Sequence, residues 1–184
     1  MLDEIHVLAI SKTGDKGFPL DQVIEVAVFR VDLAQNMMES VFDTLVRQDT
    51  ATWSEEVTAH VKETYGITPE TVEMGRQEDE VAKDLRDILQ DKVITGFDVK
   101  GDFMGHLMNE PYDLAKEAEV CSAVSARTSF IYRPETPDQT MALRMSYDMI
   151  LPDDPAGAGE DLGAYGDAAR ASALLIELRN RGLY

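Results

Sequence analysis

Short apolar runs separated by polar breaks occupy the first third of the chain, and this pattern is typical of β-strands. Residues 4–10, EIHVLAI, are almost continuously apolar, as expected of a central strand that is buried on both faces. Two further runs follow at 22–32, QVIEVAVFRVD, and at 40–48, SVFDTLVRQ. Because their connections are short, we expect these three strands to begin an antiparallel sheet.

Helical spacing replaces the strand pattern in the middle of the chain. Residues 54–66 have valines four positions apart, with Ser54 as a candidate N-cap and Gly66 as a stop signal. Residues 68–75, TPETVEMG, indicate a turn or a short helical piece. The clearest amphipathic helix lies at 78–91, because four apolar residues share one of its faces. Those residues are Val81, Leu85, Ile88 and Leu89.

Weaker signals fill the region that follows. Residues 92–98, KVITGFD, predict a strand, and residues 103–108 predict the start of a helix lying against it. Residues 119–125 form a candidate strand of small and polar side chains. Another helix is expected within 136–151.

A methionine face marks the helix expected within 136–151. It consists of Met141, Met145 and Met149. Methionines at helical spacing more often fill a core than bind a partner, so we expect this face to be buried. The candidate N-caps of this helix are Thr136 and Asp138.

The last part of the chain predicts a loop at 152–166 followed by a helix at 167–182, which Gly182 ends. The order of elements predicts an α/β fold, with a mixed sheet covered by helices on both faces and an antiparallel portion at its start. A length of 184 residues fits one domain that covers residues 1–184.

The composition is that of an ordinary globular protein, with 44% apolar and 28% charged residues. No apolar run approaches the roughly 20 residues of a membrane span, and the N-terminus lacks the basic and apolar pattern of a signal peptide. We therefore expect no membrane contact and a cytoplasmic location, with which the single Cys121 agrees.

The charge is less ordinary, because 35 acidic residues outnumber 17 basic ones and give a formal net charge of −18. Tight binding to nucleic acid draws on Lys and Arg at phosphates, and the basic residues here do not cluster in sequence. We expect nucleic-acid binding to be weak or absent, and the acidity to favour solubility. No glycine-rich phosphate loop, zinc-ligand spacing or nucleophile elbow points to another enzyme class.

Five segments, in their order and spacing, carry a resemblance to a known family. They are AISKTG at 9–14, DQVIEVAVFRVD at 21–32, YGITPETV at 65–72, VITGFDVKGDFMGHL at 93–107 and GAYGDAARASALLIEL at 163–178. With these motifs the chain resembles the DEDD family of 3′ to 5′ exonucleases, in the branch of the proofreading epsilon subunit and RNase T. The resemblance implies an RNase H-like fold, a central five-stranded mixed sheet with helices on both faces.

Family members hydrolyse phosphodiesters with two divalent metal ions about 4 Å apart, held by four carboxylates. The resemblance places the first two carboxylate positions at Ala9 and Ser11, neither of which supplies a carboxylate. The third and fourth positions hold Asp102 and Asp167, which are the remnant catalytic candidates and weak metal candidates. Two acidic ligands are too few for tight Mg²⁺ or Mn²⁺ binding, so we predict no metal site.

The general base of the family is also missing by this alignment. A histidine would fall at Leu162 in one subgroup, and a tyrosine would fall at Gly163 in the other. Other polar residues near the motifs are more simply explained as structural or surface residues. These are His6, Asp15, Asp98, His106 and Tyr165.

The two remaining aspartates have structural explanations as well. Asp167 is expected to open the last helix and to cap its free N–H groups, and Asp102 to begin a helix after Gly101. Lys12 lies next to the vacant site, and a salt bridge from it to Asp102 or Asp167 would balance charge in place of a metal.

The sequence therefore predicts an exonuclease-like domain that has lost catalysis and serves as a binding or scaffolding module, with no cofactor and a protein partner. The first alternative is an active metal-dependent 3′ to 5′ exonuclease with a rearranged site that binds a Mg or Mn ion. The second alternative is an acidic inhibitor of a nucleic-acid-binding partner.

Overall fold

The fold is described from a computed structural model of the 184-residue chain. The described residues are 3–14, 20–97, 105–114, 118–120, 143–158 and 161–183. Among the helices in these ranges, none has the length and apolar composition that a membrane span requires.

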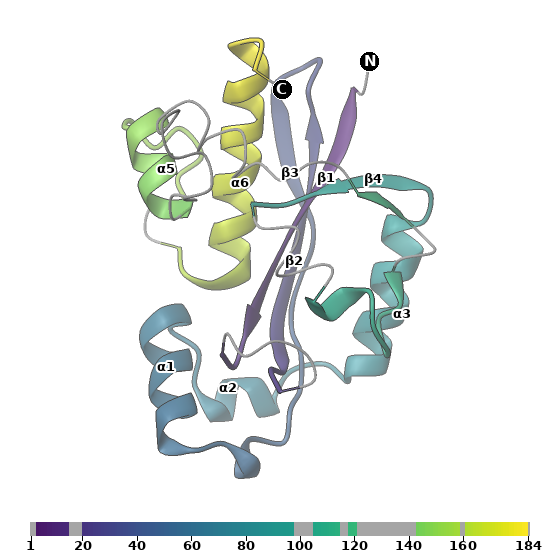
Figure 1. The fold of residues 1–184 in the computed structure, drawn as a ribbon, viewed down its shortest axis with the longest axis vertical. Helices are drawn as coiled ribbons and strands as arrows, with labels where there is room; N and C mark the ends of the chain where they lie inside the picture. The colour runs from purple at the N-terminus through teal and green to yellow at the C-terminus, as the bar shows by residue number, and fades with distance from the viewer. Residues whose placement is uncertain are drawn as a thin grey trace.

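One mixed sheet forms the centre of the molecule, with its strands in the order β3, β2, β1, β4, β5 (Figure 1). The strands are β1 (Glu4–Lys12), β2 (Val23–Asp32), β3 (Met37–Leu45), β4 (Lys92–Thr95) and the three-residue β5 (Ala118–Val120). The pairs β1–β2 and β2–β3 are antiparallel, whereas β4 runs parallel to both β1 and β5. The predicted antiparallel start and mixed α/β architecture are confirmed.

The hairpin between β2 and β3 is tighter than the sequence pattern predicts. Two backbone N–H groups, from Ala34 and Gln35, donate to Asp32 Oδ1 at 2.9 Å, and Asn36 adopts a φ of 55°. This turn lets Met37 pair with Asp32, so β3 begins three residues before the predicted 40–48 and ends at Leu45. The predicted bounds were wrong because the turn is made by side-chain hydrogen bonds rather than by glycine or proline.

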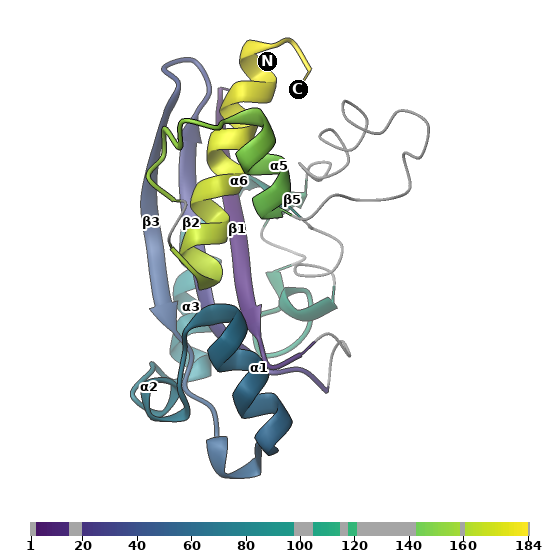
Figure 2. The same ribbon diagram turned by 90° about the vertical axis from the view of Figure 1, so that its left-hand side faces the viewer.

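Short helices cover one end of the sheet (Figures 1 and 2). They are the 3-10 turn η1 (Thr50–Thr52), α1 (Glu55–Tyr65) and α2 (Pro69–Glu73). The caps predicted for α1 are confirmed, since the Ser54 hydroxyl accepts from Val57 N–H and Gly66 ends the helix at a φ of 70°. The local sequence was sufficient here because both caps lie next to the helix that they end.

Helix α3 (Glu78–Leu89) covers one face of the sheet. Val81, Leu85 and Leu89 are fully buried, which confirms the predicted apolar face. They pack in one cluster with Leu8 and Ile10 of β1. Residues 105–107 form a single helical turn, and Leu107 joins the same cluster.

Helices α5 (Leu143–Ile150) and α6 (Gly163–Asn180) cover the opposite face, with α6 lying along β1 and β2 (Figure 1). Near the C-terminal end of α6 the contact is made by branched side chains, including Ile5, Leu174 and Leu178. Near its N-terminal end the contact is made almost entirely by alanines. These are Ala9 and Ala27 of the sheet and Ala164, Ala168 and Ala169 of α6, and we call them the alanine cluster.

The start of α6 corrects two predictions. The helix begins at Gly163, so the last four residues of the loop predicted at 152–166 are helical. Asp167 therefore lies inside the helix and does not cap it, whereas Leu162 occupies the N-cap position without a side-chain hydrogen bond. The sequence was misleading because two glycines precede Asp167 and because the N–H group of Ala164, in the first turn, bonds to Glu25, which is distant in the sequence.

The methionine face of α5 is also corrected. Met145 and Met149 are about half exposed, and the buried face of α5 consists instead of Ser146, Tyr147 and Ile150. Residues 136–142, with the predicted caps and Met141, lie outside the described ranges. Residues 103–104 of the helix predicted at 103–108 and residues 121–125 of the strand predicted at 119–125 also lie outside the described ranges. Residues 118–120 form β5, which pairs with β4.

Enlarging a residue of the alanine cluster is expected to destabilise the fold. Ala168 is fully buried, and Ala168→Leu inserts three carbons between α6 and the sheet, at a cost of about 1–3 kcal/mol. Urea unfolding followed by circular dichroism measures this change. The control is Ala59→Leu on the exposed side of α1, with an expected change within about 0.5 kcal/mol. Equal stabilities of the two variants would mean that α6 does not pack closely on the sheet.

Candidate functional site

The positions that the family resemblance singles out lie where β1 meets the first turns of α6. Ala9 and Ser11 point to the same side of the sheet, because alternate residues of a strand share a face. Ala9 packs in the alanine cluster and is 7% exposed, and Ser11 is 1% exposed. Both side chains are therefore covered by other parts of the protein.

A carboxylate from the neighbouring strand occupies the space beside Ser11. Glu25 of β2 is the cross-strand partner of Ser11, and its Oε2 accepts a hydrogen bond of 2.7 Å from the Ser11 hydroxyl. The same oxygen accepts a bond of 2.6 Å from the backbone N–H of Ala164, in the first turn of α6. One carboxylate thus joins β1, β2 and α6.

The surroundings of Glu25 make it costly to ionise. Burial raises the pKa of Glu25, the hydrogen bonds from Ser11 and Ala164 oppose that rise, and the carboxylates of Asp43 and Asp167 add to it. The positive end of the α6 dipole and its free N–H groups compensate part of this cost.

Gly163 allows the carboxylate to approach the helix so closely. Its φ is +75°, which side-chain-bearing residues rarely adopt, and a Cβ at this position would collide with the Glu25 carboxylate. Leu162, at the other candidate position for the general base, is 46% exposed.

Asp167, the fourth family position, is paired with a cation of its own helix. Arg170 Nη1 lies 3.2 Å from Asp167 Oδ1, and its side chain is 3% exposed. Burial raises the pKa of Asp167, and the guanidinium of Arg170 opposes the rise. The cation beside Asp167 is thus Arg170, which sequence reasoning missed.

Arg170 also fixes the chain that leads into α6. Its Nη2 donates to the backbone carbonyls of Ala158 and Asp161. A buried guanidinium is stable only with such partners, because it cannot lose its charge. The same side chain therefore holds both Asp167 and the segment before the helix.

The other residues named from the sequence are dispersed. Tyr165 packs edge-on against Phe29, with the ring centroids 5.2 Å apart. His6 is buried on β1, and burial lowers its pKa. His106 is buried on the helical turn at 105–107, on the α3 face of the sheet. Asp15, Asp98 and Asp102 lie outside the described residues, so the site is described without the third family carboxylate.

The residues described at this site do not fit a pair of metal ions. Metal ions of this kind need several oxygen ligands converging on one point. Within the described ranges, no group of three or more His, Cys, Asp or Glu side chains could hold a metal ion. The oxygen atom that lies nearest to Ser11, Glu25 Oε2, already accepts two hydrogen bonds.

A family model described as Exonuclease, of the RNase T type, matches residues 12–142 of the sequence. No curated protein matches the sequence closely enough to count as a relative.

Solved exonuclease structures resemble this fold. Exonuclease I of E. coli in complex with a dA16 oligonucleotide superposes with a TM-score of 0.69 at 14% identity. Exonuclease I of Methylocaldum szegediense gives 0.70 at 15%. Each match covers 98% of this chain but 41% of the other, so this chain spans less than half of those proteins.

A third solved structure is matched over a larger share of its own length. It is a 3′-exonuclease described as recognising the 3′-end of a histone mRNA stem-loop, and it matches with a TM-score of 0.62 at 16% identity, covering 98% of this chain and 83% of that one. At these identities the likeness concerns the fold, and it confirms the predicted RNase H-like class.

Removing the charge of Glu25 is expected to change how stability depends on pH. Since burial raises the pKa of Glu25 in the folded state, ionising it destabilises the fold as pH rises above the ordinary value of 4.5. Compared with Glu25→Gln, the unmodified protein should gain stability as pH falls from 7 toward 4.5. Urea unfolding at several pH values measures the difference.

The matched control is Glu80→Gln, which removes an exposed carboxylate from α3. Its stability relative to the unmodified protein should depend on pH far less. If the difference for Glu25→Gln is flat or has the opposite slope, the pKa of Glu25 is not raised and the hydrogen bonds from Ser11 and Ala164 offset the effect of burial.

Proposed function

Because this chain belongs to the RNase T family of exonucleases, we propose that it is a member that has lost metal-dependent hydrolysis and acts by binding another macromolecule. The proposal keeps the family fold and assigns the chain a role as a binding or scaffolding module. It rests on the site rather than on the fold, because one fold hosts many functions.

The observation that carries the proposal is the filling of the family's metal site by internal contacts. Ala9 lies in the alanine cluster, and the Ser11 hydroxyl donates a hydrogen bond to Glu25. Asp167 is paired with Arg170. The family needs a set of free oxygen ligands, whereas here Ser11 is bonded to Glu25 and Asp167 is paired with Arg170, which supports the absence of a metal site among the described residues.

A protein is the better candidate for the partner than a nucleic acid. The net charge of −18 opposes binding to phosphates. Among the solved structures of similar fold, one is a complex with an oligonucleotide and another concerns recognition of an RNA stem-loop. Those structures are at most 16% identical to this chain, so their ligands remain proposals for it.

The second candidate function is an exonuclease with a rearranged metal site. One observation favours it, namely that Glu25 places a carboxylate beside the position of Ser11 and interacts electrostatically with Asp167. Asp102, outside the described residues, would be the third acid of such a site. In this case a metal ion would bind Glu25 through Oε1, or it would displace the hydrogen bonds that Ser11 and Ala164 donate to Oε2.

The first test is direct. We expect the purified protein, incubated with labelled single-stranded DNA or RNA and Mn²⁺, to leave the substrate intact, because its described residues offer no oxygen cage. Gel electrophoresis of the labelled strands measures trimming. Trimming that needs Mn²⁺, that Asp167→Ala abolishes and that the exposed control Asp148→Ala retains would favour the rearranged site instead.

The second test restores the missing ligands. The double variant Ala9→Asp, Ser11→Glu is expected to bind Mn²⁺, whereas the unmodified protein binds none, because it returns two carboxylates to the family positions. Isothermal titration calorimetry measures binding, and circular dichroism shows whether the variant is folded. A folded double variant with no affinity for Mn²⁺ would mean that Ala9 and Ser11 do not occupy the family's carboxylate positions. If the double variant binds Mn²⁺, Leu162→His is added to supply the general base.

A further inference from the structure

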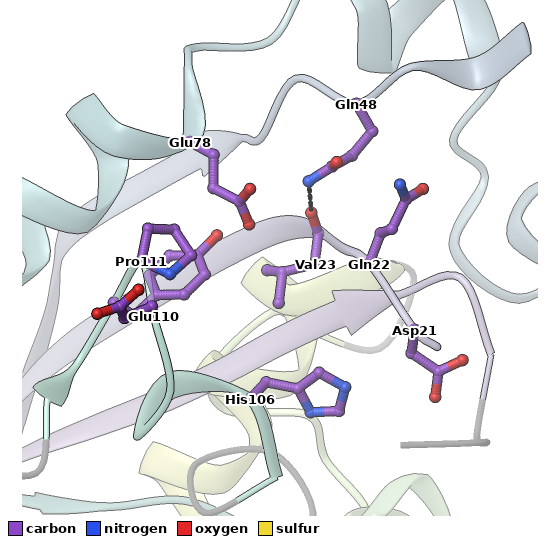
Figure 3. A pocket seen from close by; sticks show the side chains of 9 residues that line it. Asp21, Gln22, Val23, Gln48, Glu78, His106, Glu110 and Pro111 are labelled. Atoms are coloured by element: carbon purple, nitrogen blue, oxygen red, sulfur yellow. Dashed lines mark hydrogen bonds between the residues drawn. The ribbon is translucent and has the colours of Figure 1, made fainter. Parts of the chain in front are cut away.

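A cavity of about 190 Å³ opens on the α3 face of the sheet, on the side opposite the alanine cluster (Figure 3). Its walls come from the start of β2, the start of α3 and residues 106–112. A single water needs roughly 15 Å³ by the same measure, so this volume admits a small organic molecule. None of its lining residues belongs to the family's metal positions.

The lining of this cavity is acidic. Asp21, Glu78 and Glu110 contribute carboxylates, and none of the nine lining residues is a lysine or an arginine. Asp21 is only 6% exposed, whereas Glu110 is exposed. Burial raises the pKa of Glu78, and the polar groups of Tyr112 and Gln48 oppose that rise. Buried carboxylates are stabilised by a cation and repel an anion.

A buried hydroxyl lies in the wall of the same cavity. Tyr112 is 2% exposed, and burial raises the pKa of its hydroxyl, to which the nearby Glu78 carboxylate adds. The hydroxyl makes no hydrogen bond of normal geometry within the described residues. A buried hydroxyl without a well-formed hydrogen bond costs free energy that a bound donor or acceptor would recover.

Hydrogen bonds hold the glutamine side chains and the backbone carbonyls of the cavity wall in fixed positions. Gln48 Nε2 donates to the carbonyl of Val23 at 2.8 Å, which Figure 3 shows as a dashed line. Gln22 Oε1 accepts from the Trp53 indole at 2.9 Å. Arg86 donates to the carbonyls of Pro111 and Tyr112, which fixes the opposite wall. The cavity is thus formed before any ligand enters.

The arrangement favours an organic cation over a metal ion. No group of three or more acidic, His or Cys side chains in the described ranges could close on one metal ion. The three carboxylates instead line a space much larger than an ion, beside the apolar side chains of Val23 and Pro111. A ligand that combines a charged nitrogen with a short apolar chain matches both parts of this lining.

We propose that this cavity binds an alkylammonium group, with Glu78 and Asp21 accepting its N–H donors and Val23 and Pro111 contacting its carbon chain. The group belongs either to a free diamine or to a lysine side chain of a partner protein. This function is independent of the metal site and of the proposed loss of hydrolysis.

Isothermal titration calorimetry of the full chain at low salt tests the proposal with 1,4-diaminobutane and with a lysine blocked at its backbone groups. We expect saturable binding of at least one of them, with the tighter ligand identifying the source. Glu78→Gln should weaken binding about tenfold or more, as the loss of a charge-assisted hydrogen bond does. Tyr112→Phe, which removes only the hydroxyl, should weaken it less.

The matched control is Glu80→Gln, an exposed carboxylate one turn or less from Glu78 on the same helix, and it should bind like the unmodified protein. Equal affinities for Glu78→Gln, Glu80→Gln and the unmodified protein would overturn the proposal, because Glu78 would then not bind the ligand. Equal weakening in the two variants would overturn it as well, because binding would then reflect net charge alone. Absence of saturable binding, or equally tight binding of Mg²⁺ with the same loss in Glu78→Gln, would overturn it too.

Discussion

The close approach of α6 to strands β1 and β2 is the constraint on which the rest of this site depends. Alanines on both sides of the contact let the helix lie near the strands, and dispersion contacts over this surface hold it there. At that distance the first turn of α6 comes within reach of Glu25, whose carboxylate satisfies Ala164 N–H and the Ser11 hydroxyl together. Packing and hydrogen bonding therefore support each other at one point.

Most of the sheet and the helices α1 and α3 follow from the sequence because their signals are local. The apolar runs of β1 and β2, the Ser54 cap and the apolar face of α3 each lie within a few residues of the element that they define. The start of α6 does not follow, because the N–H group of Ala164 in its first turn is satisfied by Glu25, which is 139 positions away. A pattern in a short window contains no information about such a partner.

At the candidate site, too, some residues can be inferred from the sequence and others cannot. The family motifs direct attention to Ala9 and Ser11 on β1, and the structure places both side chains against α6. Glu25 and Arg170 were missed, although one signal for Glu25 was present, since a charged residue inside an apolar strand needs a buried partner. Strand alternation puts Glu25 on the same face as Ala27, and that face also holds Ser11. For Arg170 the only signal was a charged residue within an otherwise alanine-rich and leucine-rich helix.

The link between Glu25 and α6 also has a consequence for the order of folding. A contact that joins residues so distant in sequence forms only after a large loop has closed, and such contacts slow folding. During synthesis, β1 and β2 leave the ribosome long before residues 163–180, so one face of the hairpin lacks its helix until those residues emerge. Until then Glu25 remains hydrated and Ala9 and Ala27 remain exposed, and an uncovered apolar face of this kind favours aggregation of the growing chain.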